Sequence, residues 1–258
     1  MKANKYAGKY AIVTGASSGI GKAISMELAK KQVNLILVAR RIERLNAIKK
    51  DLENNYKIDV IVKSYDLSDI KNCHLLHEET KEYDPEIIIN NAGFGLVGLF
   101  QEIPLDKELE MLRLNLESVH VMTKLFVSSM NHGIIMNVSS MAGLLPTPLM
   151  AAYSASKAYV LNFSRAVNHE LHEQKKNIKI MVLCPGPVDT EFAGVANVKQ
   201  SMKGMSASEC AKIAVKGIER GRGLVVPGCL MKLTQFMVKL LPVKLILFFS
   251  YRFQKSKR

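Results

Sequence analysis

Short apolar runs alternate with segments of helical length along almost the whole chain. The runs are mostly uncharged and lack a two-residue polar alternation, which is typical of strands buried on both faces of a parallel sheet. Seven such runs occur, at residues 10–13, 34–39, 59–62, 87–89, 133–138, 178–183 and 224–226. Helical patterns lie between them, at residues 20–31, 42–54, 106–130, 152–172 and 206–220. This order predicts an α/β fold with a doubly wound parallel sheet of Rossmann type, whose strands all end at one ligand-binding edge.

Length and composition fit one folded domain. The chain has 258 residues, of which 48% are hydrophobic and 23% charged, so disordered and collagen-like chains are excluded. Its cysteines, Cys73, Cys184, Cys210 and Cys229, are far apart and form no CxxC pair. We therefore predict no metal site, no disulfide framework and a cytoplasmic location. The first residues contain only a four-residue apolar run, so we expect no signal peptide.

The net charge of +13 is concentrated near the end of the chain. Residues 220–258 carry nine Lys or Arg and no Asp or Glu, whereas residues 1–219 have a net charge of only +4. A nucleic-acid groove would need the excess on the body of the fold, so we predict no nucleic-acid partner.

A glycine-rich motif, TGASSGIG at residues 14–21, follows the first strand and leads into a helix. Gly15 suits the turn out of the strand, Gly19 lets backbone NH groups approach a pyrophosphate, and Gly21 allows close packing of the helix on the sheet. The helix N-terminus adds partial positive charge. The motif therefore predicts dinucleotide binding, with an ordinary strand-turn-helix connection as the alternative.

The residues after the second strand bear on which dinucleotide is bound. An acidic side chain there binds the ribose 2′-hydroxyl of NAD, but this chain has Arg40 and Arg41. A guanidinium binds phosphate oxygens in pairs, so the two arginines favour the 2′-phosphate of NADP(H). The alternative is that both simply begin the solvated helix at 42–54.

A possible proton-transfer group lies at the start of the helix at 152–172. Tyr153 and Lys157 are one turn apart and share a helix face, and Ser139 and Ser140 end the fifth strand. An adjacent ammonium favours the phenolate of a tyrosine, which makes Tyr153 a candidate proton donor and acceptor. A YxxxK pattern alone also fits an aromatic core residue with a solvated lysine.

Together these motifs resemble those of the short-chain dehydrogenase/reductase family, over residues 8–227. The matches come in family order: TGASSGIG, Asp66 in YDLSD, NNAG at 90–93, Asn115 in RLNLES, the serines before MAG, YSASK, and PGPVDT at 185–190. The resemblance implies a tetrad in which Tyr153 exchanges the proton and Lys157 binds the nicotinamide ribose and lowers the tyrosine pKa. Ser140 would hold the substrate oxygen, and Asn115 would fix a water in a proton relay.

The resemblance also implies a set of cofactor contacts. Asp66 would lie near the adenine, Asn91 would line the cofactor cleft, and Thr190 would meet the nicotinamide carboxamide. With the glycine-rich turn and the arginines, the full expected set is Gly15, Ser17, Ser18, Gly19, Ile20, Gly21, Arg40, Arg41, Asp66, Leu67, Asn91, Ala92, Gly93, Tyr153, Lys157, Pro185, Gly186, Val188 and Thr190.

The expected function is an NADP(H)-dependent oxidoreductase that transfers a hydride between nicotinamide and a carbonyl or hydroxyl carbon. The alternative is a non-catalytic NADP(H)-binding regulatory or scaffold protein. The family grips its substrate with the segment after PGPVDT, here 191–205, and with loops after the fourth and fifth strands. The side chains there suggest an apolar pocket for a lipid-, steroid- or acyl-like substrate: Phe94, Leu96, Leu144, Leu145, Met150, Phe192 and Val195.

We divide the chain into a dinucleotide-binding catalytic domain at 1–227 and a basic amphipathic extension at 228–258. Five apolar residues of the extension share one helical face before Pro242: Leu233, Phe236, Met237, Leu240 and Leu241. The longest uncharged stretch is far short of the roughly 20 residues of a membrane span. The extension could contact an anionic membrane surface, close the substrate cleft or pack on a partner subunit. We also expect a homo-oligomer.

Overall fold

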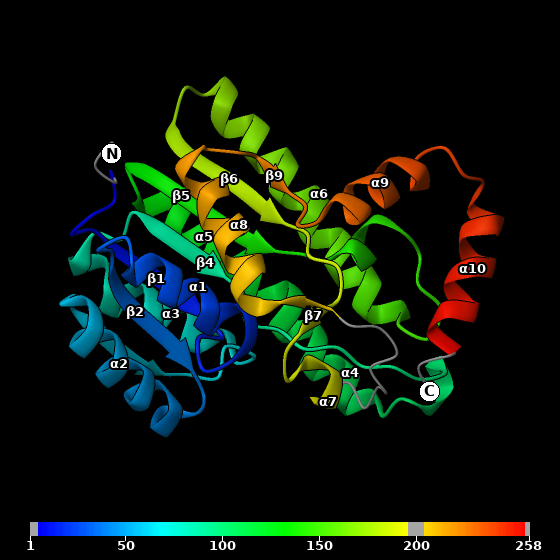
Figure 1. The fold of residues 1–258 in the computed structure, drawn as a ribbon, viewed down its shortest axis with the longest axis horizontal. Helices are drawn as coiled ribbons and strands as arrows, with labels where there is room; N and C mark the ends of the chain where they lie inside the picture. Colours follow the sequence, from blue (N-terminus) through cyan, green and yellow to red (C-terminus); the bar gives the residue numbers. More distant parts are fainter. Residues whose placement is uncertain (1–4, 196–203, 256–258) are drawn as a thin grey trace.

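The computed structural model describes residues 5–195 and 204–255. Within them, a seven-stranded parallel sheet has the order β3-β2-β1-β4-β5-β6-β9 (Figure 1). Its strands are β1 Tyr10–Thr14, β2 Asn34–Ala39, β3 Val60–Ser64, β4 Ile87–Asn90, β5 His132–Val138, β6 Asn177–Leu183 and β9 Leu224–Val225. The chain runs outward from β1 to β3, returns to β4 beside β1, and continues to β9. The predicted doubly wound sheet is confirmed.

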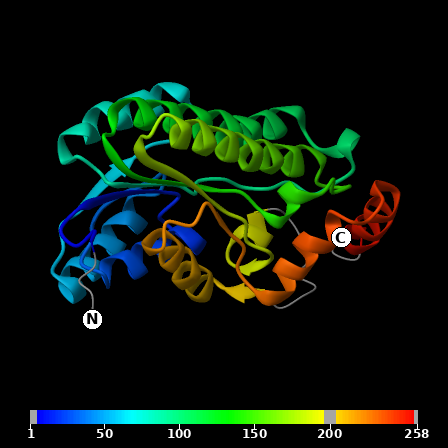
Figure 2. The same ribbon diagram turned by 90° about the horizontal axis from the view of Figure 1, so that it is seen from above.

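Helices cover both faces of the sheet in two layers (Figure 2). One layer is α1 Gly19–Ala29, α2 Ile42–Tyr56 and α8 Ala207–Glu219, whose apolar side chains pack with those of the strands in one core cluster. The other layer contains α3 Ile70–Thr80, α4 Leu105–Leu112, α5 Ser118–Ser129 and α6 Ala151–Glu173. Its side chains form a second cluster, in which Phe126 is 1% exposed. The central strands are thus buried on both faces, as their uncharged sequences predict.

The helix expected at 106–130 consists of two α-helices joined by a π-helical turn. α4 ends at Leu112, the turn covers Arg113–Glu117, and α5 begins at Ser118 without a break in the helical path. A π-turn holds one extra residue, and such turns are frequent at functional sites. Here the turn contains Asn115, whose side chain is fully buried.

Short elements complete the carboxyl edge of the sheet. The 3₁₀ turns Phe100–Glu102 and Met141–Leu144 follow β4 and β5, whereas a third, Lys81–Tyr83, leads into the start of β4 at the opposite edge. After β6, the strand β7 Val188–Asp189 pairs in parallel with β8 Met205–Ser206. α7 Phe192–Val195 lies between these two strands in the sequence.

The C-terminal extension forms two helices, α9 Cys229–Val238 and α10 Val243–Lys255. They lie beside the carboxyl ends of β5 and β6, at one end of the molecule (Figures 1 and 2). Of the helices formed by the described residues, none is both long enough and apolar enough to cross a bilayer.

Gly21 allows α1 to pack against the turn that precedes it. A Cβ at this position would lie 2.5 Å from the carbonyl oxygen of Gly15 and 2.5 Å from Nδ2 of Asn91. A methyl group would therefore overlap with backbone, which cannot move as easily as a flexible side chain.

We predict that Gly21→Ala destabilises the protein by about 1–3 kcal/mol, because overpacking exceeds the gain in helix propensity. The melting temperature measured by circular dichroism should fall by several degrees. Gly223→Ala is the control, since the nearest atom to its Cβ would be 4.0 Å away. Equal melting temperatures for the two variants would contradict the packing argument.

Candidate active site

The glycine-rich turn brings several predicted cofactor residues together between β1 and α1. Gly15 and Gly19 have φ angles of +65° and +55°, which side chains other than glycine rarely adopt. α1 begins at Gly19, so the first NH groups of the helix point out of the sheet edge beside Ser17, Ser18 and Ile20. The turn thus has the backbone shape and the partial positive charge that suit a pyrophosphate.

The end of β4 is hydrogen-bonded to this turn. The Thr14 hydroxyl accepts hydrogen bonds from the backbone NH groups of Asn91 and Ala92, at 2.9 and 3.0 Å, and donates to the Ile89 carbonyl at 3.2 Å. Asn91 Nδ2 donates to the Thr14 carbonyl at 2.9 Å. These hydrogen bonds therefore fix the position of the glycine-rich turn relative to the segment that follows β4, and both segments are expected to contact the cofactor.

Arg41 lies on the glycine-rich turn. Its guanidinium donates to the Ser17 hydroxyl at 3.0 and 3.2 Å and to the Ser18 hydroxyl at 2.9 Å. Its Nη1 also forms an ion pair of 2.9 Å with Glu191, which pairs with Arg44 at 2.6 Å. These hydrogen bonds from Arg41 and Arg44 hold the pKa of the Glu191 carboxyl below its usual value. A cation and two hydroxyl groups thus converge at the ribose end expected for a 2′-phosphate.

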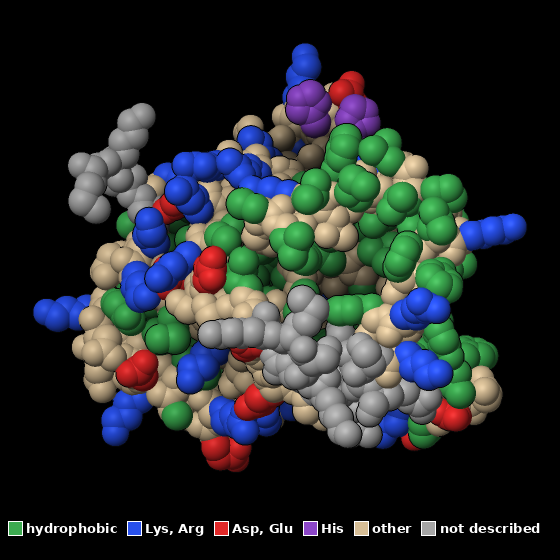
Figure 3. All heavy atoms as spheres, turned by 45° about the vertical axis from the view of Figure 1, so that its right-hand side comes forward, with side chains coloured by type: hydrophobic (Ala, Val, Ile, Leu, Met, Phe, Trp, Pro, Cys, Tyr) green, Lys and Arg blue, Asp and Glu red, His purple; other side chains and the backbone are tan. Residues whose placement is uncertain are grey.

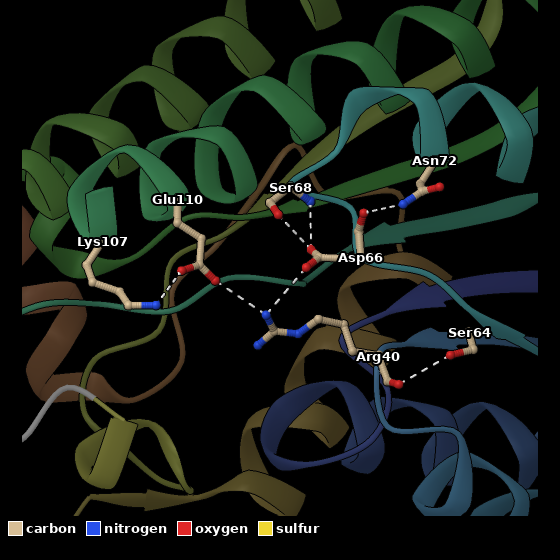
Figure 4. Close-up of polar contacts among 7 residues, drawn as sticks. All are labelled: Arg40, Ser64, Asp66, Ser68, Asn72, Lys107 and Glu110. Atoms are coloured by element: carbon tan, nitrogen blue, oxygen red, sulfur yellow. Dashed lines mark hydrogen bonds and ion pairs between the residues drawn. The ribbon is translucent and has the colours of Figure 1, made fainter. Parts of the chain in front are cut away.

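Arg40 points toward Asp66 and Glu110 (Figure 4), whereas Arg41 contacts the glycine-rich turn. Arg40 Nη1 lies 3.5 Å from the Asp66 carboxylate and 3.4 Å from that of Glu110. Asp66 also accepts hydrogen bonds from the backbone NH and hydroxyl of Ser68, at 3.0 and 2.7 Å. Burial raises the pKa of Asp66, but the bonds from Ser68 and Arg40 outweigh it and leave the pKa below its usual value. Arg40 therefore links the ends of β2 and β3 to α4, and Leu67 is buried beside Asp66.

Tyr153 and Lys157 are buried on the inner face of α6, with 8% and 5% of their surfaces exposed. Lys157 Nζ donates a hydrogen bond of 3.0 Å to the Val138 carbonyl and lies 5.9 Å from the centre of the tyrosine ring. The two residues expected to act together therefore face the end of β5.

The two serines that end β5 have different surroundings. Ser139 is buried and donates a hydrogen bond of 2.7 Å to the Lys157 carbonyl, so its hydroxyl is engaged with the backbone of α6. Ser140 accepts a hydrogen bond from the Ala142 NH at 3.1 Å and is close enough to Tyr153 to lower the pKa of its phenol. Ser140 is thus the serine whose hydroxyl lies next to the tyrosine.

Asn115, the fourth residue of the expected tetrad, lies against the loop that follows β4. Its side-chain amide pairs with the backbone of Phe94, donating at 2.8 Å and accepting at 3.1 Å. A Cβ at Gly93 would lie 2.7 Å from the Asn115 oxygen and 3.5 Å from Lys157 Nζ. The π-turn thus places Asn115 beside Lys157, with its amide holding the loop after β4.

Burial shifts the pKa values of Tyr153 and Lys157. It raises the pKa of Tyr153 to about 12, although the neighbouring Ser140 hydroxyl acts in the opposite direction. It lowers the pKa of Lys157 to about 8. The sequence led us to expect a lowered tyrosine pKa, whereas in this structure desolvation of the phenolate dominates. Near pH 7 the Tyr153 hydroxyl therefore carries its proton.

The segment after β6 closes the site. The Pro185 carbonyl accepts a hydrogen bond from the Met141 NH at 2.9 Å, and Val188 lies in β7. A Cβ at Gly186 would lie 2.4 Å from the Met231 sulfur of α9, and one at Gly19 would lie 3.2 Å from the Thr190 side chain. Thr190 of PGPVDT thus lies against the glycine-rich turn, while Gly186 of the same motif packs against α9.

Apolar side chains surround the tyrosine. Phe94, Leu96, Met150 and Phe192 belong to one cluster with Tyr153, and the Phe192 ring lies 5.6 Å from the tyrosine ring. Leu144 packs instead in a neighbouring cluster under α9, and Leu145 is partly exposed outside both. The Val195 side chain lies outside the described residues. Four of the seven apolar side chains expected at the substrate pocket are therefore gathered around Tyr153.

Two features of the site carried no recognisable sequence signal. Glu191 pairs with arginines about 150 residues earlier in the chain, and no local pattern marks that contact. Asn90, Asn137 and Ser164 form a buried hydrogen-bonded chain behind the site, with distances of 2.8 and 2.9 Å. Within residues 5–195 and 204–255, no three His, Cys, Asp or Glu side chains lie close enough together to hold a metal ion.

The family is shown by comparison with known proteins. A family model described as short chain dehydrogenase matches residues 9–218. The chain is 34% identical to human inactive hydroxysteroid dehydrogenase-like protein 1, over 75% of this chain and 60% of that protein. It is 30% identical to mouse very-long-chain 3-oxoacyl-CoA reductase, over 94% of this chain and 80% of that protein. The chain belongs to the short-chain dehydrogenase/reductase family, and it spans about three fifths of the length of the first of these relatives.

Solved structures show the same fold. A short-chain dehydrogenase from Sphingobium yanoikuyae in complex with NADPH superposes with a TM-score of 0.80 at 28% identity, covering 86% of this chain and 88% of the other. A short chain dehydrogenase/reductase from Burkholderia phymatum in complex with NAD gives 0.82 at 23% identity, covering 90% and 92%. Both structures therefore share the fold of this chain, and each holds a nicotinamide dinucleotide.

We predict that burial of Lys157 makes stability depend on pH. Its pKa is about 8 in the folded protein and near 10.5 when the chain unfolds, so the unfolded state binds more protons between these values. The free energy of unfolding should therefore rise with pH by about 1.4 kcal/mol per unit between about pH 8 and 10. Lys157→Met should lack this contribution. Denaturant titrations at several pH values measure it, and parallel curves for the two proteins would contradict it.

Proposed function

We propose that the chain is an NADP(H)-dependent oxidoreductase that interconverts a carbonyl and a hydroxyl group on an apolar substrate. The observation that carries the proposal is the buried Tyr153, which lies next to Ser140 and is surrounded by apolar side chains at the edge where the glycine-rich turn lies. The groups needed for proton transfer and for dinucleotide binding thus meet at one edge of the sheet.

The residues of this chain would supply the proton and the orientation. A bound nicotinamide dinucleotide supplies hydride chemistry in this family. The Tyr153 hydroxyl, protonated near neutrality, would donate its proton to the substrate oxygen during reduction. Ser140 would hold that oxygen by a hydrogen bond, and Lys157 would bind the ribose. The relay role of Asn115 stays a prediction, since both ends of its amide bind the Phe94 backbone.

The preference for NADP(H) rests on this chain's own arginines, because related folds bind either nucleotide. Arg41, Ser17 and Ser18 form a donor group that matches a phosphate, and no acidic side chain follows β2 before Glu43. The Arg41 guanidinium also pairs with Glu191, whose carboxylate would compete with a phosphate for this arginine. Release of Glu191 would therefore accompany phosphate binding.

An apolar substrate is supported by the cluster around Tyr153, in which the Phe192 ring packs at a tilt against the tyrosine ring. The relatives are named for a hydroxysteroid and for a very-long-chain 3-oxoacyl-CoA, both of which carry large apolar parts. A steroid- or acyl-like carbonyl compound fits both observations.

The second candidate is a non-catalytic NADP(H)-binding regulatory or scaffold protein. One relative is named as inactive, which favours this reading. Against it, this chain has a residue of the required type at each of the four tetrad positions, Asn115, Ser140, Tyr153 and Lys157. NADPH oxidation across ketones, aldehydes and 3-oxoacyl thioesters separates the two functions, since tight binding without turnover would support the second.

The proposed setting is the cytoplasm. Cys73, Cys184 and Cys210 are buried free thiols and Cys229 is an exposed one, which suits a reducing compartment. The expected homo-oligomer stays a prediction, and gel filtration with light scattering tests it.

We predict that Tyr153→Phe lowers turnover by about 10²–10⁴-fold, because only the transferable proton is removed. NADPH affinity, measured by fluorescence titration, should stay unchanged. The matched control is Tyr159→Phe, on the same helix, whose hydroxyl bonds to His120 instead. Retention of most of the rate in the Tyr153 variant would assign proton transfer to another group.

We predict that Arg41→Ser weakens NADPH binding by about 10–100-fold and NADH binding much less, since charge-assisted hydrogen bonds to the phosphate are lost. Arg40→Ser should have a smaller effect, because Arg40 is held between Asp66 and Glu110. Glu191→Gln should tighten NADPH binding by removing the competing carboxylate. Equal NADPH and NADH affinities in the wild type would overturn the cofactor assignment.

A further inference from the structure

The C-terminal extension has its apolar side chains on the outside. Six large ones on α9, α10 and the link between them are 57–64% exposed: Leu230, Leu233, Phe236, Leu240, Val243 and Phe249. Figure 3 shows hydrophobic side chains gathered over this end of the molecule, around a hollow. Such a large contiguous patch is unusual on a protein surface that faces only water.

The inward faces of the same helices are comparatively polar. On α10, the inward positions are Ile246, Ser250 and Gln254, four residues apart, and the buried Gln254 side-chain oxygen has no hydrogen-bond partner within the described residues. On α9, the partly exposed side chains are Met231, Thr234, Gln235 and Val238, so half of the inward face is polar. A surface helix that folds in water normally has the opposite arrangement. The outward faces are therefore suited to an apolar medium.

Basic side chains accompany the patch. Lys232, Lys239, Lys244, Arg252 and Lys255 are exposed on or beside the same helices, and residues 220–258 contain no acidic residue. The Arg252 guanidinium stacks on the Phe248 ring at 4.2 Å, which keeps a cation next to exposed aromatic surface. A second copy of this chain would bring an equally basic surface to the contact and would be repelled. An anionic surface with an apolar interior would attract both kinds of side chain.

We propose that α9 and α10 form a docking surface for an anionic lipid bilayer. Helices of 10 and 13 residues are too short to span a bilayer, so they would lie in the headgroup region with their apolar faces inward. The docking goes beyond the proposed reductase function and does not depend on it, because binding is measured without turnover.

The docking surface adjoins the candidate active site. Met231 of α9 packs on Gly186 in the turn that follows β6. A cavity of about 120 Å³ lies between Tyr251 of α10, Phe100 of the loop after β4 and Leu149 before α6. The loops expected to hold the substrate are thus next to the bilayer when the chain is docked, and an apolar substrate could pass from lipid to Tyr153 over a short path.

Co-sedimentation of the full chain with vesicles tests the proposal. The protein should bind vesicles of phosphatidylcholine with phosphatidylglycerol at low salt, and should be released at about 0.5 M NaCl, where charges are screened. It should bind pure phosphatidylcholine vesicles far more weakly. Binding that ignores both lipid charge and salt would overturn the proposal.

Charge variants test the assignment to this surface. Replacing Lys232, Lys239 and Lys244 together by Gln should weaken the partition coefficient about 100-fold, given the contribution of each basic side chain near anionic headgroups. The matched control replaces three exposed lysines elsewhere, Lys50, Lys124 and Lys176, by Gln. An equal loss in both triple variants would show a general charge effect and overturn the assignment.

A pair of leucine variants tests the apolar part. Leu233→Ser should weaken vesicle binding severalfold, whereas Leu75→Ser on α3, which is 49% exposed in the native chain, should not. Both side chains are exposed, so both variants should keep the native circular dichroism spectrum and melting temperature. A dimer in solution that Leu233→Ser dissociates, together with no vesicle binding by the native chain at low salt, would assign the surface to a second copy instead.

Discussion

The hydrogen bonds between Thr14 and the end of β4 are the constraint on which the site depends. A single hydroxyl bonds to three backbone groups of Ile89, Asn91 and Ala92, and the Asn91 amide returns a bond to the Thr14 carbonyl. Each bond contributes only about 1 kcal/mol to stability. Their combined effect is geometric, because the glycine-rich turn and the loop that carries Gly93 cannot move independently. Asn115 and Lys157 are then positioned against a loop that is already fixed.

A second polar network supports the site from behind. Asn90 and Asn137 face each other across β4 and β5, and Asn137 reaches Ser164 on α6. These side chains are almost fully buried, so an apolar replacement on one strand would leave its neighbour with one buried hydrogen bond fewer. The network ties the helix that carries Tyr153 and Lys157 to the central strands. Tyr153 is thus held by the sheet as well as by its own helix.

Much of the fold follows from the sequence because buried parallel strands are unmistakably apolar, and the ends of the strands lie where those runs stop. Individual contacts were less predictable. Neighbouring Arg40 and Arg41 look equivalent in the sequence, yet one pairs with Asp66 and the other with Ser17. The pKa of Tyr153 depends on how completely the surrounding chain excludes water, which spacing alone does not reveal. The sequence pattern shows that α9 has an apolar face, but whether that face points into the fold or outward depends on the elements packed against the helix.

The π-turn at Arg113–Glu117 has a consequence for how this part of the chain can change. One residue of an α-helix corresponds to about 100° of rotation. The π-turn absorbs its extra residue without that rotation, so α4 and α5 keep their faces on either side of it. Loss of one residue from the turn would restore a regular α-helix with the same packing of Met111, but would displace Asn115 from the Phe94 backbone. The extra residue therefore serves the position of Asn115, and the packing of the two helices does not require it.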